Sequence, residues 1–115
     1  MVIRLLREQN IPLINIVRRE EQVQLLKEKY GAEYVLNSEA PGFMEELKAL
    51  SKKLNATVCF EAIAGDMSGK ITEALQNNGV IITYGLLSEK NMHGIHPIDF
   101  MAKNLRFEGF FLPLW

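Results

Sequence analysis

Two adjacent arginines, Arg18 and Arg19, stand where charged side chains could bind a phosphate group. They follow directly after LINIV, a short apolar run at residues 13–17 that is rich in β-branched residues. A guanidinium group binds phosphate oxygens through charge-assisted hydrogen bonds, each contributing roughly 1.5–3 kcal/mol before solvent screening. The carboxylates of Glu20 and Glu21 could instead pair with the arginines or accept a hydroxyl group. A solvated run of charges is the plain alternative.

A second candidate segment, Tyr84-Gly85-Leu86-Leu87, lies at the end of the apolar run that begins at Val80. Glycine at the end of a strand lets another group approach the backbone closely, because it carries no side chain. The segment is therefore a candidate for ligand contact through its backbone. The alternative is a glycine that only ends a strand.

Four other residues carry reactive side chains, but their arrangement predicts neither a catalytic residue nor a zinc site. His93 and His96 form one i, i+3 pair in a predicted loop, whereas zinc takes three or four ligands. Cys59 lies within a predicted strand, where a buried free cysteine behaves as a small hydrophobe. Glu61, near the end of the same strand, is expected to be a satisfied polar group rather than a base.

The elements that must position these residues follow from two alternating periods of apolar residues. Helices are predicted at residues 1–9, 19–30 and 41–54, where apolar side chains recur every three or four positions. Pro41 is expected to open the third helix, because proline is favoured at the first helical position. The expected apolar face of the second helix consists of Val23, Leu25, Leu26 and Tyr30.

Short runs of apolar, often β-branched residues predict strands at 13–17, 34–36, 57–60, 80–84 and 105–112. Two further helices are predicted among them, one starting between Gly65 and Gly69 and one at residues 98–103. Strands that alternate with helices indicate an α/β fold with a parallel sheet and right-handed crossovers. The near-continuous apolarity of the first run suits a strand buried on both faces.

The predicted fold class is therefore α/β, a Rossmann-like doubly wound parallel sheet that lacks the first strand and the Gly-rich turn. No GxGxxG occurs in the sequence, and the strands suit the second to sixth positions of such a sheet. In the usual order 3-2-1-4-5-6 the first strand lies in the middle. Without it, strands 13–17 and 57–60 lose their shared neighbour, and two apolar edges invite association. We expect the chain to close this gap, to pair strands with another copy, or to be unstable.

Composition narrows the function classes further. The 115 residues suffice for one domain at most, and a formal net charge of −1 provides no basic field for nucleic acid. No window offers the roughly 18 consecutive apolar residues of a membrane span. The one cysteine cannot form an internal disulfide, which favours a reducing, intracellular compartment.

Five segments in order, INIVRRE, EKYGAEYVLNS, VCFEAIAGD, VIITYGLLS and LRFEGFFLPLW, give the chain a family resemblance. The sequence resembles the medium-chain dehydrogenase/reductase superfamily, and most of all its zinc-independent branch of quinone oxidoreductases and 2-enoyl thioester reductases. The resemblance implies NADP(H)-dependent hydride transfer to an enoyl thioester, a quinone or a similar activated C=C. It also implies that residues 1–115 are part of an NAD(P)-binding Rossmann domain. The catalytic domain would lie outside this chain, and the piece alone would be inactive.

The resemblance also assigns roles to individual residues. At the end of the second strand, arginine accommodates the 2′-phosphate of NADP, whereas an acid prefers the 2′-hydroxyl of NAD. Arg18 and Arg19 therefore favour NADPH over NADH, with Glu20 as a further adenosine-side contact. The nicotinamide half is expected at Tyr84, Gly85, Leu86 and Leu87 and at Phe110, Phe111 and Leu112, although the family commonly has tryptophan at or near Phe111.

The last predicted strand has a second possible role. In the family, the last strands of two subunits pair and extend the sheet, so self-association through residues 105–112 is expected. The resemblance is compatible with a cytoplasmic or a mitochondrial location and with no zinc.

Two other classes remain open. A Rossmann-like methyltransferase also tolerates loss of GxGxxG, but it should carry an acid at the end of the second strand, where this chain has arginines. A standalone α/β interaction module that dimerises through residues 105–112 would bind no nucleotide. Replacing both arginines by alanine would change nothing in such a module.

Overall fold

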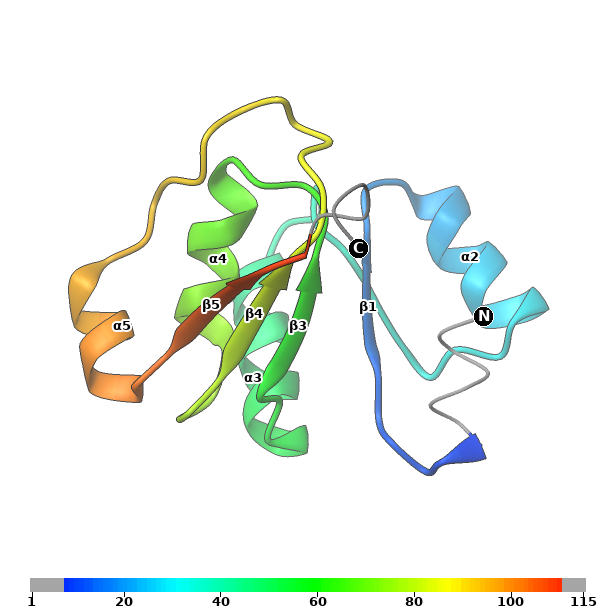
Figure 1. Cartoon of the computed structure of the whole chain (residues 1–115). Helices are drawn as coiled ribbons and strands as arrows, with labels where there is room; N and C mark the ends of the chain where they lie inside the picture. Colours follow the sequence, from blue (N-terminus) through cyan, green and yellow to red (C-terminus); the bar gives the residue numbers. More distant parts are fainter. Residues whose placement is uncertain (1–7, 111–115) are drawn as a thin grey trace. The chain divides into compact units, whose positions relative to one another are not determined.

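The computed structural model describes residues 8–110 (Figure 1). The chain divides into two compact units, Met1–Leu50 and Ser51–Trp115. Of the helix predicted at residues 1–9, the described part is Glu8, which is helical, and Gln9, which lies in a turn. The rest of that helix lies outside the described residues.

The first unit contains a strand–helix–strand motif made of β1 (Ile14–Val17), α2 (Glu20–Lys29) and β2 (Tyr34–Asn37). The two strands pair in parallel, with Ile14 opposite Tyr34 and Val17 opposite Asn37. Helix α2 carries acids in its first turn and lysines in its last, which suits the helix dipole. The predicted elements of this region are thereby confirmed to within one or two residues.

The core of the first unit lies between α2 and the two strands. It consists of buried Val23, Ala32 and Val35, with half-buried Val17 and Leu26 packed against them. The prediction that Leu25 and Tyr30 join this core is wrong, because both are nearly half exposed. Leu25 lies beside the stripe that faces the core, and Tyr30 follows the last helical residue.

Strand β1 is less buried than its apolar sequence predicts. All four of its residues are half-buried rather than buried on both faces. Among the described strands β1 has one neighbour, β2. A strand with one partner keeps more of its surface exposed than a central strand of a parallel sheet does.

Helix α3 (Phe43–Leu54) carries residues of both units, and it begins later than predicted. Pro41 does not open this helix, because Gly42 has a φ of +78°, outside the helical region. Pro41 and Gly42 instead form a turn. The apolar positions Phe43 and Leu47 are buried, as their spacing predicts.

The second unit contains β3 (Val58–Glu61), α4 (Asp66–Ala74), β4 (Val80–Thr83), α5 (Pro97–Lys103) and β5 (Arg106–Gly109). Its three strands are parallel and lie in the order β3-β4-β5. The predicted strand at 105–112 ends at its glycine, and Phe111 and Leu112 lie outside the described residues.

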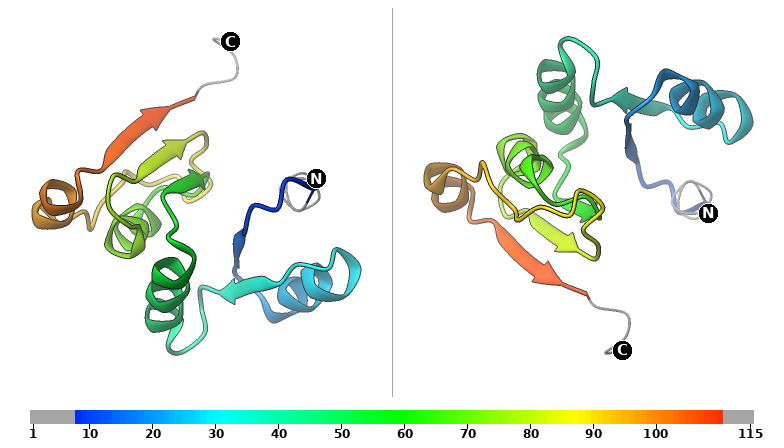
Figure 2. Two further views of the ribbon diagram at one scale, coloured as in Figure 1. Left: turned by 90° about the horizontal axis from the view of Figure 1, so that it is seen from below. Right: turned by 90° about the horizontal axis from the view of Figure 1, so that it is seen from above.

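The two helices of the second unit, α4 and α5, lie on the same face of its sheet (Figure 2). The side chains that point to this face include Ile81, which is fully buried, and the ring of Phe107 stacks on Phe100 of α5. The opposite face of β3 exposes Val58 and Phe60, which are 52% and 61% accessible. An exposed apolar face is unusual for a parallel sheet, because such sheets are normally covered on both sides.

The α/β class with parallel strands is confirmed. The described strands form two separate sheets, β1-β2 and β3-β4-β5, so β1 and β3 do not pair with each other. Closure of the predicted gap stays a prediction. Pairing with another copy and instability stay predictions.

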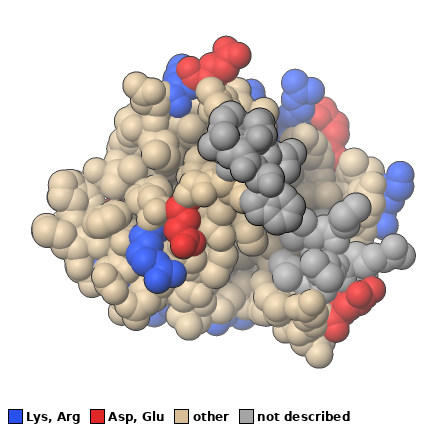
Figure 3. All heavy atoms as spheres, in the orientation of Figure 1, with Lys and Arg blue, Asp and Glu red and all other residues tan. Residues whose placement is uncertain are grey.

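No helix within residues 8–110 is long and apolar enough to cross a membrane. On the face seen in Figure 3, acidic and basic side chains are scattered among uncharged residues.

Candidate functional site

The carboxyl ends of β3 and β4 bring together two loops of the second unit. Ligands of parallel α/β sheets bind outside the carboxyl ends of the strands, so these loops are the first place to look. The loop at residues 62–65 follows β3, and the segment 84–88 follows β4. Backbone N–H groups of Tyr84, Leu87 and Ser88 donate to the carbonyls of Glu61, Ala62 and Ile63 at 3.0, 2.9 and 3.0 Å.

The buried carboxylate of Glu61 holds the first of these loops. Its Oε1 accepts hydrogen bonds from the backbone N–H groups of Ile63 at 3.0 Å and Ala64 at 2.6 Å. Its Oε2 accepts from the hydroxyl of Ser68 at 3.2 Å. The side chain is 3% exposed. The expectation of a satisfied polar group is confirmed by these contacts.

Gly85 lies against the 62–65 loop. A Cβ added to Gly85 would come within 3.0 Å of the carbonyl oxygen of Ala62 and 3.3 Å of its Cβ. The predicted close approach to the Gly85 backbone is therefore made by Ala62 of the same chain. Whether a ligand also approaches Gly85 stays a prediction.

The segment after β4 keeps several groups available. The side chains of Tyr84, Leu86 and Leu87 are exposed. Among the described residues, the backbone N–H groups of Gly85 and Leu86 donate to no acceptor. The hydroxyl of Thr83 is buried and likewise has no hydrogen-bond partner in the described part of the chain. These unpaired donors are what a polar ligand group could bind.

Phe110 follows β5 and stays beside β4. Its backbone N–H donates to the carbonyl of Thr83 at 2.9 Å, and its side chain is partly exposed. The structure therefore places Phe110 next to the strand that precedes Tyr84. Phe111 and Leu112, which the sequence assigns to the same ligand contact, lie outside the described residues.

The two arginines lie in the first unit, after the carboxyl end of β1. Arg18 and Arg19 are exposed, and within residues 8–110 neither guanidinium group takes part in an ion pair. Glu20 Oε2 instead accepts from the side-chain amide of Asn37 at 3.3 Å. The alternative in which the glutamates neutralise the arginines is therefore not found in the described structure.

Sequence reasoning missed the residue that orders the backbone at this point. The side-chain carbonyl of Gln22 accepts from the backbone N–H groups of Arg18 and Arg19, both at 3.2 Å. A glutamine three residues after a helix N-cap is a known signal for such a reciprocal cap. The signal was present in the sequence, but the N-cap itself is an arginine, which hides the usual pattern.

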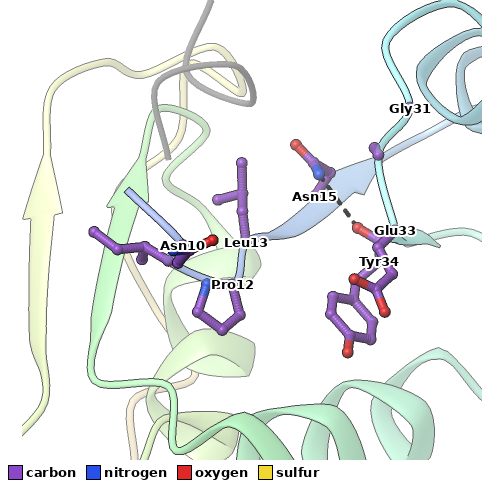
Figure 4. Close-up of a pocket in the computed structure, with 9 residues that line it drawn as sticks. Asn10, Pro12, Leu13, Asn15, Gly31, Glu33 and Tyr34 are labelled. Atoms are coloured by element: carbon purple, nitrogen blue, oxygen red, sulfur yellow. Dashed lines mark hydrogen bonds between the residues drawn. The ribbon is translucent and has the colours of Figure 1, made fainter. Parts of the chain in front are cut away.

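An open pocket of about 300 Å³ lies in the first unit, between the amino ends of β1 and β2 (Figure 4). Asn10, Pro12 and Leu13 line one side, and the opposite side includes Gly31 and Glu33. The side-chain amide of Asn15 donates to the carbonyl of Tyr34 at 3.2 Å. This pocket lies at the other end of the strands from Arg18, where parallel sheets do not usually bind their ligands.

Comparison with known proteins identifies the family. Residues 1–114 match the family model described as zinc-binding dehydrogenase. The chain belongs to this zinc-binding dehydrogenase family. The family match and the relatives confirm the predicted resemblance to medium-chain dehydrogenases/reductases of the quinone reductase and enoyl thioester reductase type.

Three relatives show how much of a family member the chain represents. It is 28% identical to the mitochondrial enoyl-[acyl-carrier-protein] reductase of Dictyostelium discoideum, over 99% of this chain and 33% of the relative. A provisionally assigned NADPH:quinone reductase from Mesorhizobium loti is 32% identical and has a TM-score of 0.89, over 99% and 33%. The complex of Etr1p with NADP and crotonyl-CoA is 23% identical and has a TM-score of 0.77, over 94% and 32%. The chain thus spans about a third of the length of the relatives it matches.

Cys59 and His96, two of the other residues with reactive side chains, have local roles in this zinc-binding dehydrogenase family member. Burial, and then the charge of Glu61, raises the pKa of the Cys59 thiol to about 12, so the thiol stays protonated. His96 Nδ1 accepts from the backbone N–H of Ile98 at 3.1 Å and caps α5. Residues 8–110 contain no group of three or more His, Cys, Asp and Glu placed to hold a metal ion. The absence of zinc in the protein nevertheless stays a prediction.

Each unit by itself offers groups that fit part of a dinucleotide. The exposed guanidinium groups of Arg18 and Arg19 suit a phosphate, and the unpaired backbone donors of Gly85 and Leu86 suit a carboxamide. The Gly-rich turn that would bind a pyrophosphate has no counterpart in this sequence. The cofactor roles of all these residues stay predictions.

Proposed function

We propose that this chain is the NADP(H)-binding part of an oxidoreductase that reduces an enoyl thioester, a quinone or a similar activated C=C. The observation that carries the proposal is the pair of exposed arginines, free of ion pairs in the described structure, after the carboxyl end of β1. The family match and the printed functions of the relatives support it. A separate catalytic domain would belong to the same protein.

The adenosine half of the cofactor is assigned to Arg18, Arg19 and Glu20. A guanidinium group would bind the 2′-phosphate that distinguishes NADPH from NADH. Gln22 fixes the backbone at both arginines, so their side chains start from a defined position. The carboxylate of Glu20 would accept a ribose hydroxyl beside its contact with Asn37.

The nicotinamide half is assigned to Tyr84, Gly85, Leu86 and Leu87 together with Phe110, Phe111 and Leu112. The free N–H groups of Gly85 and Leu86 would bind the carboxamide, and the exposed apolar side chains would exclude water from the ring. When bound, NADPH supplies the hydride. The residues of this chain bind and orient it, and we assign proton donation to a group outside these 115 residues.

We propose three further properties, which concern activity, assembly and location. A chain without the proton donor and the pyrophosphate turn should be inactive on its own. We also propose self-association through residues 105–112, because β5 pairs on one side with β4 and has no second neighbour among the described strands. The mitochondrial relatives support a mitochondrial location, with the cytoplasm as the alternative.

The test is the double variant Arg18→Ala/Arg19→Ala in the protein purified from its source. Loss of one charge-assisted contact of about 1.4 kcal/mol lowers NADPH affinity about tenfold. The affinity for NADH should stay within twofold, because NADH lacks the 2′-phosphate. Lys27→Ala/Lys29→Ala, at the other end of α2, is the matched control and should change neither affinity.

A second candidate function is an interaction module without nucleotide binding. The exposed face of β3, with Val58 and Phe60, favours it. It predicts a defined oligomer and equal, negligible affinity for both dinucleotides. The methyltransferase alternative has no support in the family match.

A further inference from the structure

The proposed reaction leaves one buried ionisable side chain without a role. Glu61 is 3% exposed, and its partners in the described structure are two backbone N–H groups and one hydroxyl. None of these partners is a cation. Burying a carboxylate costs free energy unless hydrogen bonds satisfy it. A buried glutamate at this place therefore needs a structural or functional explanation.

The two backbone donors of Glu61 lie in the part of the loop with the least favourable backbone. Ala64 has a φ of +63°, a conformation that residues with a side chain rarely adopt, and Gly65 has the same φ. The N–H of Ala64 is the donor at 2.6 Å from Glu61 Oε1. The carboxylate thus holds the chain in a conformation that it would otherwise leave.

This loop in turn holds the segment after β4. Leu87 and Ser88 donate their backbone N–H groups to the carbonyls of Ala62 and Ile63. Gly85 lies so close to Ala62 that a Cβ on it would be 3.0 Å from the carbonyl oxygen. A shift of the 62–64 backbone must therefore move Gly85 and its neighbours.

We infer that Glu61 is a positioning residue for the nicotinamide half of the cofactor. It acts through the 62–64 loop, which sets the position of the free N–H groups at Gly85 and Leu86. The inference rests on the proposed function. Glu61 touches neither cofactor nor substrate in this account, and it exchanges no proton.

The chemistry of the side chain separates two variants. In the described structure the Glu61 side chain accepts three hydrogen bonds. Glutamine keeps one oxygen for the two backbone donors and turns an amide N–H₂ toward the Ser68 hydroxyl, which can accept. Alanine removes all three acceptor contacts. Glu61→Gln should therefore perturb the loop slightly and Glu61→Ala strongly.

The test compares two ligands on the protein purified from its source. Adenosine 2′,5′-bisphosphate carries the 2′-phosphate but no nicotinamide, whereas NADPH carries both. Glu61→Ala should weaken NADPH binding tenfold or more and leave the affinity for the bisphosphate within twofold. Glu61→Gln should weaken NADPH binding about threefold. Asp66→Asn, an exposed acid at the start of α4, is the matched control and should change neither affinity.

Amide hydrogen exchange gives a second measurement that needs no ligand. It is made on Glu61→Gln, so the inference can still be tested if Glu61→Ala does not fold. Glu61→Gln should speed exchange at Ile63 and Ala64 and also at Leu87 and Ser88, while the core strand β4 stays protected. An equal loss of affinity for NADPH and for the bisphosphate in Glu61→Ala would overturn the inference. The inference would also be overturned if Glu61→Gln changed neither the exchange rates nor the NADPH affinity. If the unmodified protein binds neither ligand, the proposed function fails and takes this inference with it. If it binds both and Glu61→Ala has no effect, the inference alone fails.

Discussion

Replacing Gly69 by alanine tests the contact between α4 and the loop that follows β4. A Cβ on Gly69 would lie 2.4 Å from the carbonyl oxygen of Gly94, 2.5 Å from its carbonyl carbon and 2.7 Å from the carbonyl oxygen of His93. All three atoms belong to the backbone, so no flexible side chain can move aside. The loop itself would have to leave its place against the helix.

The magnitude follows from two opposing effects. Overpacking of this kind costs typically about 1–3 kcal/mol, and backbone contacts this close favour the upper end. Alanine gains about 1 kcal/mol over glycine inside a helix. The net loss of about 2 kcal/mol in the free energy of unfolding lowers the Tm by roughly 4–16 °C, depending on domain size.

The assay is thermal unfolding of Gly69→Ala, together with amide exchange at His93, whose N–H donates to the carbonyl of Gly65 at 3.1 Å. The variant should melt earlier, and the His93 amide should exchange faster. Gly109→Ala is the matched control, because a Cβ there meets no atom within 4 Å and should change the stability by about 0.5 kcal/mol or less. An unchanged or raised Tm with a protected His93 amide would refute the contact.

Other consequences of the structure can be measured in the same protein. With a pKa of about 12, Cys59 should react with iodoacetamide at pH 8 far more slowly than in the unfolded chain. Because the unfolded thiol ionises near 9 and the folded one near 12, the unfolded state releases this proton first. Stability should therefore fall between about pH 9 and pH 12, and Cys59→Ala should remove that part of the fall; equal pH dependence in both would contradict it. His96→Ala should lower the free energy of unfolding by about 1 kcal/mol, because the N–H of Ile98 loses its cap, whereas His96→Asn should retain most of the stability. Urea denaturation of the two variants checks this, and equal loss in both would argue against the cap.

Much of the fold could be predicted because periodicity reports which residues face a core. The strands at β1, β2, β3 and β4 were predicted to within about one residue from short runs of β-branched and apolar residues. The family relationship was visible in five short segments that the comparisons confirm.

The predictions are wrong where the local backbone geometry differs from what the residue types and their spacing predict. Pro41 is a good first helical residue, but Gly42 adopts a positive φ that only the structure reveals, and the helix starts later. Tyr30 continues the spacing of the apolar stripe, yet it follows the last helical residue and stays exposed. The spacing of apolar residues does not show at which residue a helix ends.

In the candidate site, too, a residue's type could be interpreted from the sequence, but its contacts could not be predicted. Glu61 could be recognised as a satisfied polar group, but its two backbone donors, Ile63 and Ala64, lie in a loop without any period. The contact of Gly69 with Gly94 joins a helix to another irregular segment. Such contacts depend on the path of the backbone, and single-sequence patterns do not encode that path.

The central claim is tested most directly by the dissociation constants of the protein from its source for NADPH and for NADH. One phosphate contact by Arg18 or Arg19 of about 1.4 kcal/mol makes NADPH bind about tenfold more tightly than NADH. A preference of that size or larger, reduced at high salt, is the predicted result. Equal affinities, a preference for NADH, or no binding of either would contradict the account.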